Sequence, residues 1–229
     1  TRRSSDLYTF SKSHGDGENG GQEGVSFPDP LNRRAGRGRY RFDQTHNMVA
    51  NFVWELPGQR IRNPIRYVIG GWQSNGILSI RTGFPFNVNQ GGDLNTGGPV
   101  RPDQVGEPRL DNPSRAQWFN PMAFSRVTCN VPSRMDLCRF GTFGYNVLSG
   151  PGQRNFDFSL FKNFPFKERF NIQFRWEAIN ATNTPFFGDP GGIGFTNVNQ
   201  LTPDGTRMGE VRSLRNPMRI MQWGLKFMF

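Results

Sequence analysis

The sequence predicts an all-β fold, and more specifically part of an antiparallel transmembrane β-barrel. Three observations predict it. Apolar and polar residues alternate over several segments of about 9 residues or more, the length at which a tilted strand crosses the hydrocarbon layer. Long and short connections alternate between these segments, as in outer-membrane barrels. The apolar positions are rich in aromatic side chains, with 22 Phe and 5 Trp in 229 residues.

The composition argues against a helical membrane protein and against an ordinary soluble core. Only 34% of the residues are hydrophobic, whereas 28 are Gly and 17 are Pro. No run of about 18 apolar residues is present, so no membrane helix is expected. A barrel tolerates this polarity because only alternate strand residues face lipid. The net charge of +10 is compatible with nucleic acid, an acidic membrane surface or an anionic substrate.

The first three predicted strands cover 5–12, 40–56 and 72–88. The first shows only Tyr8 and Phe10, and we expect it to be cut near its start. In the second, one face carries Tyr40, Phe42, Met48, Ala50, Phe52, Trp54 and Leu56. In the third, one face carries Trp72, Leu78, Ile80, Phe84, Phe86 and Val88.

The last three predicted strands cover 153–164, 168–180 and 219–229. In 153–164, Phe161 breaks the alternation of apolar and polar residues. The apolar face of 168–180 carries Phe170, Ile172, Phe174, Trp176 and Ala178. That of 219–229 carries Met221, Trp223, Leu225, Phe227 and Phe229.

The connections predict the orientation of the strands. Segments 13–39, 89–152 and 183–217 are long, whereas 57–71 and 165–167 are short. If the C-terminus lies in the periplasm, every long connection falls outside the cell and every short one inside, as expected of an outer-membrane barrel. The same alternation of residues also occurs in a soluble β-sandwich, which remains the alternative.

Six strands are too few to close a membrane barrel, since the smallest has about 8. Open strand edges in lipid leave backbone groups unpaired at several kcal/mol each. We therefore expect the remaining wall to come from upstream sequence or from other chains, and the start of the protein to be missing from this sequence.

Several segments resemble one family. Residues 150–164 (GPGQRNFDFSLFKNF) and 168–183 (ERFNIQFRWEAINATN) are similar to the penultimate hairpin of Oar-like TonB-dependent outer-membrane receptors. Residues 217–229 resemble the final strand of that family, and 71–77 and 82–86 fit the same group. The resemblance covers nearly the whole chain apart from the loop tips.

The resemblance implies a barrel of about 22 strands, of which this chain supplies the last six. It also implies a plug domain and a segment that binds the TonB complex, neither of which this sequence contains. The terminal Phe229 resembles the signal that the barrel-assembly machinery reads. The implied function is energised uptake of an unidentified bulky substrate across the bacterial outer membrane.

Three groups of candidate site residues follow. Inward-facing polar residues are expected to line the lumen, namely Gln173, Arg175, Glu177, Gln222 and Lys226. An arginine cluster is expected at the outer rim, where it could contact lipopolysaccharide phosphates, bind RNA or remain solvated: Arg33, Arg34, Arg37 and Arg39. Cys129 and Cys138 form a candidate disulfide, with pairing left open.

The sequence contains no pattern that predicts catalysis. It has no nucleophile–His–acid arrangement, phosphate-binding Gly loop or zinc spacing, and His14 and His46 do not suggest a ligand pair. We expect no enzyme activity, no cofactor, no metal and no nucleic-acid partner. The alternatives to a transporter are a structural or adhesive outer-membrane barrel and, behind it, a soluble basic nucleic-acid-binding β protein.

Overall fold

The computed structural model describes most of the chain. The described residues are 2–15, 32–58, 64–89, 101–127, 139–166, 170–190, 195–197 and 208–229.

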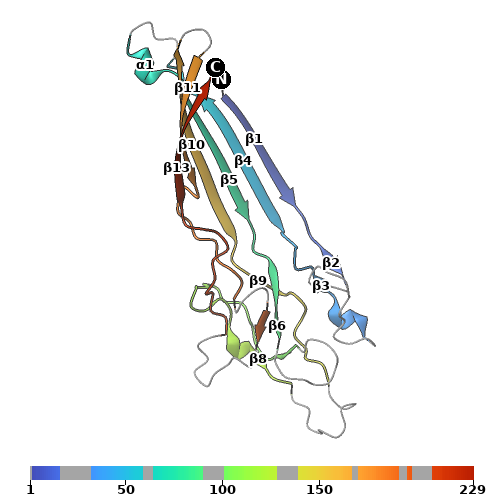
Figure 1. Ribbon diagram of the computed structural model, residues 1–229. Coiled ribbons are helices and arrows are strands. Elements are labelled where there is room, and N and C mark those ends of the chain that lie inside the picture. Colours follow the sequence, from blue (N-terminus) through green and yellow to red (C-terminus); the bar gives the residue numbers. More distant parts are fainter. Residues whose placement is uncertain are drawn as a thin grey trace.

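Six long strands form one antiparallel sheet, which we call the wall (Figure 1). In their spatial order they are β1 (Arg2–Phe10), β4 (His46–Glu55), β5 (Trp72–Arg81), β10 (Gln153–Phe166), β11 (Phe170–Ile179) and β13 (Ile220–Met228). Each derives from one of the segments predicted from alternation, and each pairs with its neighbour along the chain. The all-β, antiparallel prediction is therefore confirmed. β1 and β13 are the two edges, so the wall is an open sheet.

The register aligns side chains of like polarity across the wall. Leu160 of β10 lies opposite Trp176 of β11, which lies opposite Trp223 of β13. One residue earlier in β10, Ser159 lies opposite Glu177, which lies opposite Gln222. Because side chains alternate between the faces of a sheet, this register produces one largely apolar face and one largely polar face.

The predicted strand 40–56 is wrong at its start. β4 begins only at His46, and a separate short strand β3 (Gly38–Arg39) pairs with β2 (His14–Gly15). A turn separates the two strands, with the backbone N–H of Asp43 donating to the carbonyl of Tyr40 at 2.9 Å. The apolar residues at 40 and 42 continue the alternation, but they lie in this turn.

The predicted strand 72–88 is two strands in two different sheets. β5 ends at Arg81, and β6 (Pro85–Asn89) pairs instead with β9 (Leu148–Ser149) and β12 (Phe195–Asn197). The chain leaves the wall at Gly83, where a Cβ atom would lie 1.8 Å from the carbonyl oxygen of Gly150. Only glycine permits this close approach of two backbones.

Beyond β6 the long connections form a second layer with its own core. This loop layer comprises β6, residues 101–127 and 139–149, and 208–211, and it includes β7 (Asp103–Gln104), η2 (Pro121–Ala123) and β8 (Phe124–Ser125). Its buried cluster consists of Phe86, Val88, Phe119, Ala123, Phe124, Phe143, Leu148 and Met208. Phe124 meets Phe119 and Phe143 edge-on at centroid distances of 5.8 and 4.9 Å, which is a favoured aromatic geometry.

The opposite end of the wall carries a single turn of helix, α1 (Arg66–Ile69), in the connection between β4 and β5. Figure 1 shows α1 at the same end as both chain termini, far from the loop layer. Near β3, η1 (Arg33–Gly36) is a short 3-10 turn. In the described part of the chain, none of the helices has the length and apolar composition needed to span a membrane.

Candidate functional site: the polar face of the wall and the loop layer

The five polar residues predicted to share a face do share one. The Gln173 Nε2 donates to Asn163 Oδ1 at 2.9 Å, and the Arg175 Nε donates to Gln173 Oε1 at 2.8 Å. The Gln222 amide donates to the carboxylate of Glu177 across the β11–β13 pair. Lys226 lies opposite Gln173 in the same register. These side chains form a hydrogen-bonded polar surface along the last three strands.

Phe161, which breaks the alternation in the sequence, has a partner on this polar face. It lies opposite Arg175, whose guanidinium sits 4.6 Å from the centre of its ring. A cation over an aromatic face is attracted by the ring quadrupole. The exception in the pattern is therefore an Arg–Phe contact, and the register of β10 is unbroken.

The other face of the wall carries a cluster of aromatic side chains on β10, β11 and β13. Ring centroids are separated by 6.0 Å for Phe158 and Trp176, 6.0 Å for Trp176 and Trp223, and 5.8 Å for Phe174 and Trp223. Tyr8 and Phe10 lie at the loop end of β1, whereas Trp54 and Trp72 lie at the α1 end of β4 and β5. Aromatic side chains thus gather towards both ends, where a membrane protein meets its two interfaces.

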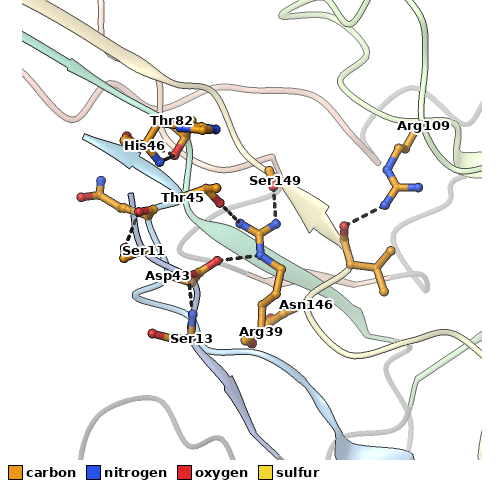
Figure 2. Close-up of polar contacts among 12 residues, drawn as sticks. Ser11, Ser13, Arg39, Asp43, Thr45, His46, Thr82, Arg109, Asn146 and Ser149 are labelled. Carbon is orange, nitrogen blue, oxygen red and sulfur yellow. Dashed lines mark hydrogen bonds and ion pairs between the residues drawn. The ribbon is translucent and has the colours of Figure 1, made fainter. Parts of the chain in front are cut away.

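A polar cluster joins the wall to the loop layer, and Figure 2 shows Arg39 at its centre. We call this cluster the rim junction; it consists of Ser13, Arg39, Asp43, Thr45 and Ser149. The Arg39 guanidinium donates to Asp43 Oδ2 at 2.8 Å, to Ser149 Oγ at 2.8 Å and to Thr45 Oγ1 at 3.4 Å. The second carboxylate oxygen of Asp43 accepts the Ser13 backbone N–H at 2.7 Å. The junction therefore links β3, the turn before β4, β9 and the segment after β1.

Asn146 continues the rim junction into the loop layer. It is fully buried and has a left-handed backbone conformation with φ of 51°. Its side-chain amide donates to the Arg39 carbonyl at 2.6 Å, and its backbone N–H donates to Asn87 Oδ1 at 2.6 Å. Asparagine is one of the few residues that tolerate this conformation. It thereby fixes β3 and β6 to the same turn.

An ion pair holds the beginning of the loop layer to its later part. Arg139 binds Asp103 through two parallel hydrogen bonds of 2.7 and 2.5 Å, and the Thr142 backbone N–H adds a third at 3.1 Å. The hydrogen bond from Arg139, followed by that from Thr142, outweighs burial and lowers the pKa of Asp103 below its ordinary value. Bidentate geometry makes this a strong kind of pair.

A second ion pair lies at the base of the loop layer. Arg215 donates to Asp189 Oδ2 at 2.6 Å, and its guanidinium lies 5.4 Å from the Phe84 ring and 5.6 Å from the Phe186 ring. Although the pair is close, burial dominates and raises the pKa of Asp189. The attraction of Arg215 opposes that shift without overcoming it. Burial of this carboxylate therefore outweighs the attraction of both Arg215 and Arg41 in setting its pKa.

An open cavity of about 900 Å³ lies beside the rim junction. Its cationic lining consists of Arg39, Arg81 and Arg154, and aromatic side chains come from Tyr8, Trp118 and Phe187. Among the described residues that line it, none is acidic.

The structure separates the predicted arginine cluster. Arg39 is engaged in the rim junction, whereas Arg34 and Arg37 are exposed. The side chain of Arg33 lies outside the described residues, as do Cys129 and Cys138. Phe229 follows the last residue of β13 and is 97% exposed.

The two histidines occupy different elements. His14 lies in β2, and His46 starts β4, where its Nδ1 is 2.8 Å from the Tyr8 hydroxyl. Within the described residues, no group of three or more His, Cys, Asp or Glu side chains could hold a metal ion.

Sequence reasoning missed the rim junction and the Arg215–Asp189 pair. Arg39 and Asp43 have a spacing of four, but Arg39 ends a predicted loop and Asp43 lies in a predicted strand, where that helical spacing predicts no contact. Arg215 and Asp189 are 26 residues apart in one long connection. No local sequence pattern predicts an ion pair between residues this far apart.

Comparison with protein families gives one match. The chain matches the model of a family described as the outer membrane beta barrel domain, over residues 6–222. No curated protein and no solved structure matches it.

Proposed function

The chain belongs to the outer membrane beta barrel domain family, and we propose that it forms the C-terminal wall of a TonB-dependent receptor that imports a bulky substrate. Family membership places the protein in the bacterial outer membrane. Receptor type, transport and partners go beyond the family and are argued below.

The observation that carries the proposal is the division of the wall into two faces. The apolar face is continuous across β10, β11 and β13 and carries aromatic residues, whereas the opposite face of these strands holds hydrogen-bonded amides and charges such as Gln173, Arg175 and Glu177. A membrane barrel has this arrangement, with lipid outside and a polar lumen inside.

The two edges of the wall support a larger barrel. β1 and β13 each have an unpaired side in the described sheet. Unpaired backbone groups within a bilayer cost several kcal/mol each, so further strands must continue the wall. The resemblance to Oar-like receptors supplies a size of about 22 strands, of which these six are the last.

The polar surfaces suggest how such a receptor would use this part of the wall. Gln173, Arg175, Glu177, Gln222 and Lys226 would line the lumen around a plug domain. The loop layer has its own packed core and would present a preformed surface to an incoming substrate. Contact with the TonB complex would use a region that this sequence does not contain.

A contact with lipopolysaccharide is proposed for the loop end of the wall. Arg34 and Arg37 are exposed there, and Arg39 and Arg154 line the cavity beside the rim junction. Guanidinium groups match phosphate oxygens well in geometry and charge. The anionic headgroups of the outer leaflet would contact these side chains at the loop end of the wall.

The experiment uses the full-length protein expressed in its bacterial envelope. We expect it in the outer-membrane fraction, with a gel mobility that changes on heating, as folded barrels show. In-cell crosslinking should yield an adduct with TonB, which disappears when the TonB-binding segment is deleted. A heat-modifiable barrel that gives no adduct would favour the structural or adhesive alternative. Recovery in the soluble fraction would contradict both and favour a soluble β protein.

A further inference from the structure

The described part of the connection between β4 and β5 exposes several apolar side chains around α1. Four consecutive or nearly consecutive side chains around α1 are exposed: Ile65 by 48%, Tyr67 by 60%, Val68 by 70% and Ile69 by 45%. A turn that merely reverses the chain in water needs none of them. Contiguous apolar exposure of this kind marks an interaction surface.

The position of Lys162 shows which face of the wall α1 covers. In β10, Lys162 alternates with Phe158, Leu160 and Phe164, so it belongs to the apolar face. Its side chain is 3% exposed, and its ammonium donates to the carbonyl of Val68 at 3.0 Å and to that of Gly70. The same ammonium lies 5.2 Å from the rings of Trp72 and Phe164.

A second residue of the apolar face holds the same turn. Trp72 lies directly opposite Lys162 in the β5–β10 register, and its indole Nε1 donates to the Val68 carbonyl at 2.8 Å. Two adjacent side chains of the apolar face therefore bind the carbonyl end of α1. The backbone of α1 is folded against that face, at the end of the strands.

These contacts stabilise both the ammonium of Lys162 and the carbonyl groups at the end of α1. A lysine ammonium exposed to lipid is expensive, and carbonyls at a helix end need partners, with cations favoured there. One turn of helix is marginal alone, so the contacts with Lys162 and Trp72 hold it in place. The one described lysine on the apolar face thereby has hydrogen-bond acceptors, and the helical turn is held against the wall.

We propose that α1 is an interfacial membrane anchor, which inserts Ile65, Val68 and Ile69 into the headgroup–acyl boundary of the periplasmic leaflet. The occupant is phospholipid because the exposed side chains continue the membrane-facing surface, beside Trp72 and Phe164. Short apolar side chains with a tyrosine at the boundary are typical of interfacial segments. The proposal rests on the orientation given under the proposed function, with the loop layer outside the cell.

The test measures the depth of a fluorescent label on the full-length protein. Cysteine is introduced at Val68, in a background in which Cys129 and Cys138 are changed to Ser. Phe164→Cys serves as the control on the wall itself, and Val105→Cys, 64% exposed in the loop layer, as the control in water. The labelled protein is reconstituted in phosphatidylethanolamine–phosphatidylglycerol vesicles whose acyl chains carry bromine close to the glycerol backbone.

We expect the labels at positions 68 and 164 to be quenched several-fold more strongly than the label at 105. Quenching at 164 without quenching at 68 would overturn the anchor and leave the barrel wall intact. Absence of quenching at both would overturn the wall assignment as well. In intact cells a membrane-impermeant maleimide should modify Val105→Cys and spare Val68→Cys; modification of both would overturn the periplasmic location.

Lys162→Met tests whether docking holds the anchor, with Lys226→Met on the polar face as the matched control. We expect Lys162→Met to reduce the quenching at 68 and the control to leave it unchanged, while both proteins remain heat-modifiable. If Lys162→Met does not assemble, Trp72→Phe removes the second hydrogen bond to Val68 and should give a smaller reduction. Unchanged quenching in an assembled variant would overturn the role of that contact.

Discussion

Asp43 accepts a 2.8 Å hydrogen bond from the Nε of Arg39, and its own side chain is completely buried. Its other oxygen binds the backbone N–H of Ser13. One carboxylate thus ties three separate segments at the place where the wall passes into the loop layer (Figure 2).

Changing Asp43 to Asn should loosen the rim junction without unfolding the wall. Asparagine can still accept from Ser13, but its amide presents donors to the donor Nε of Arg39. A buried donor that loses its partner costs about 1–3 kcal/mol. We expect faster hydrogen exchange of residues 38–46, measured by mass spectrometry. Glu107→Gln in the exposed Glu107–Arg109 pair, with N–O separation of 3.8 Å, is the control and should change nothing.

Acidification should release the Asp103–Arg139 contact. The folded-state pKa of Asp103 is lowered. Its contribution to stability is therefore present above the unfolded pKa and is lost as the pH falls through the lowered folded value. Limited proteolysis of the loop layer across acidic pH should show increasing cleavage. In Asp103→Asn, cleavage should be raised already at neutral pH and should depend less on pH; a variant with the same pH profile as the parent would contradict this role.

Arg215→Met should produce the opposite pH dependence. The pKa of Asp189 is already raised by burial, and removing the cation raises it further. The protonated form then favours the folded state, so the variant should recover protection as the pH falls through this raised pKa. At neutral pH we expect a loss of about 3 kcal/mol, the low end for a broken buried pair because Arg215 is partly exposed.

The readout for Arg215→Met is hydrogen exchange in 208–216. Arg212→Met, which removes an exposed pair with Glu210, is the matched control. Exposed pairs contribute about 0–1 kcal/mol, so this control should have little effect. Equal losses in the two variants would mean that burial of Asp189 plays no part.

Gly71→Ala should weaken the turn that follows α1. Gly71 has φ of 75°, and a Cβ atom there would lie 2.6 Å from the carbonyl oxygen of Asn163. Both the backbone conformation and the contact exclude a side chain. We expect a lower temperature for the heat-induced gel shift than in the parent. Gly106→Ala is the control, because the nearest atom to its added Cβ would be 3.6 Å away; a similar decrease in both would contradict the assignment.

Alternation in the sequence predicted the wall because most of its strands carry mainly apolar side chains on one face and mainly polar side chains on the other. It assigned Gln173 and Gln222 to the same face before any register was known. It could not locate the ends of β4 and β5, since Phe42 and Phe86 keep the period of two although one lies in a turn and the other in a different sheet. Periodicity reports which way a side chain points and carries no information about its strand partner.

The contacts between distant segments could not be predicted for a different reason. A charged residue such as Lys162 is unexpected on an apolar face. In the folded chain, its ammonium donates hydrogen bonds to the carbonyls of Val68 and Gly70. Arg39 looked like a surface cation, but the turn at Asp43 directs it inward. In both cases the partner is set by the path of a connection, which local sequence does not encode.

Lipid contact along β10 tests the central claim most directly. Spin labels are placed one at a time from Asp157 to Phe161 in the full-length protein in bilayers, and collisions with oxygen, which concentrates in the hydrocarbon, are measured. We predict high oxygen accessibility at Phe158 and Leu160 and low values at Asp157, Ser159 and Phe161, a period of two. Uniformly low accessibility, as in the interior of a soluble sandwich, or high values at the odd positions would contradict the membrane-wall account.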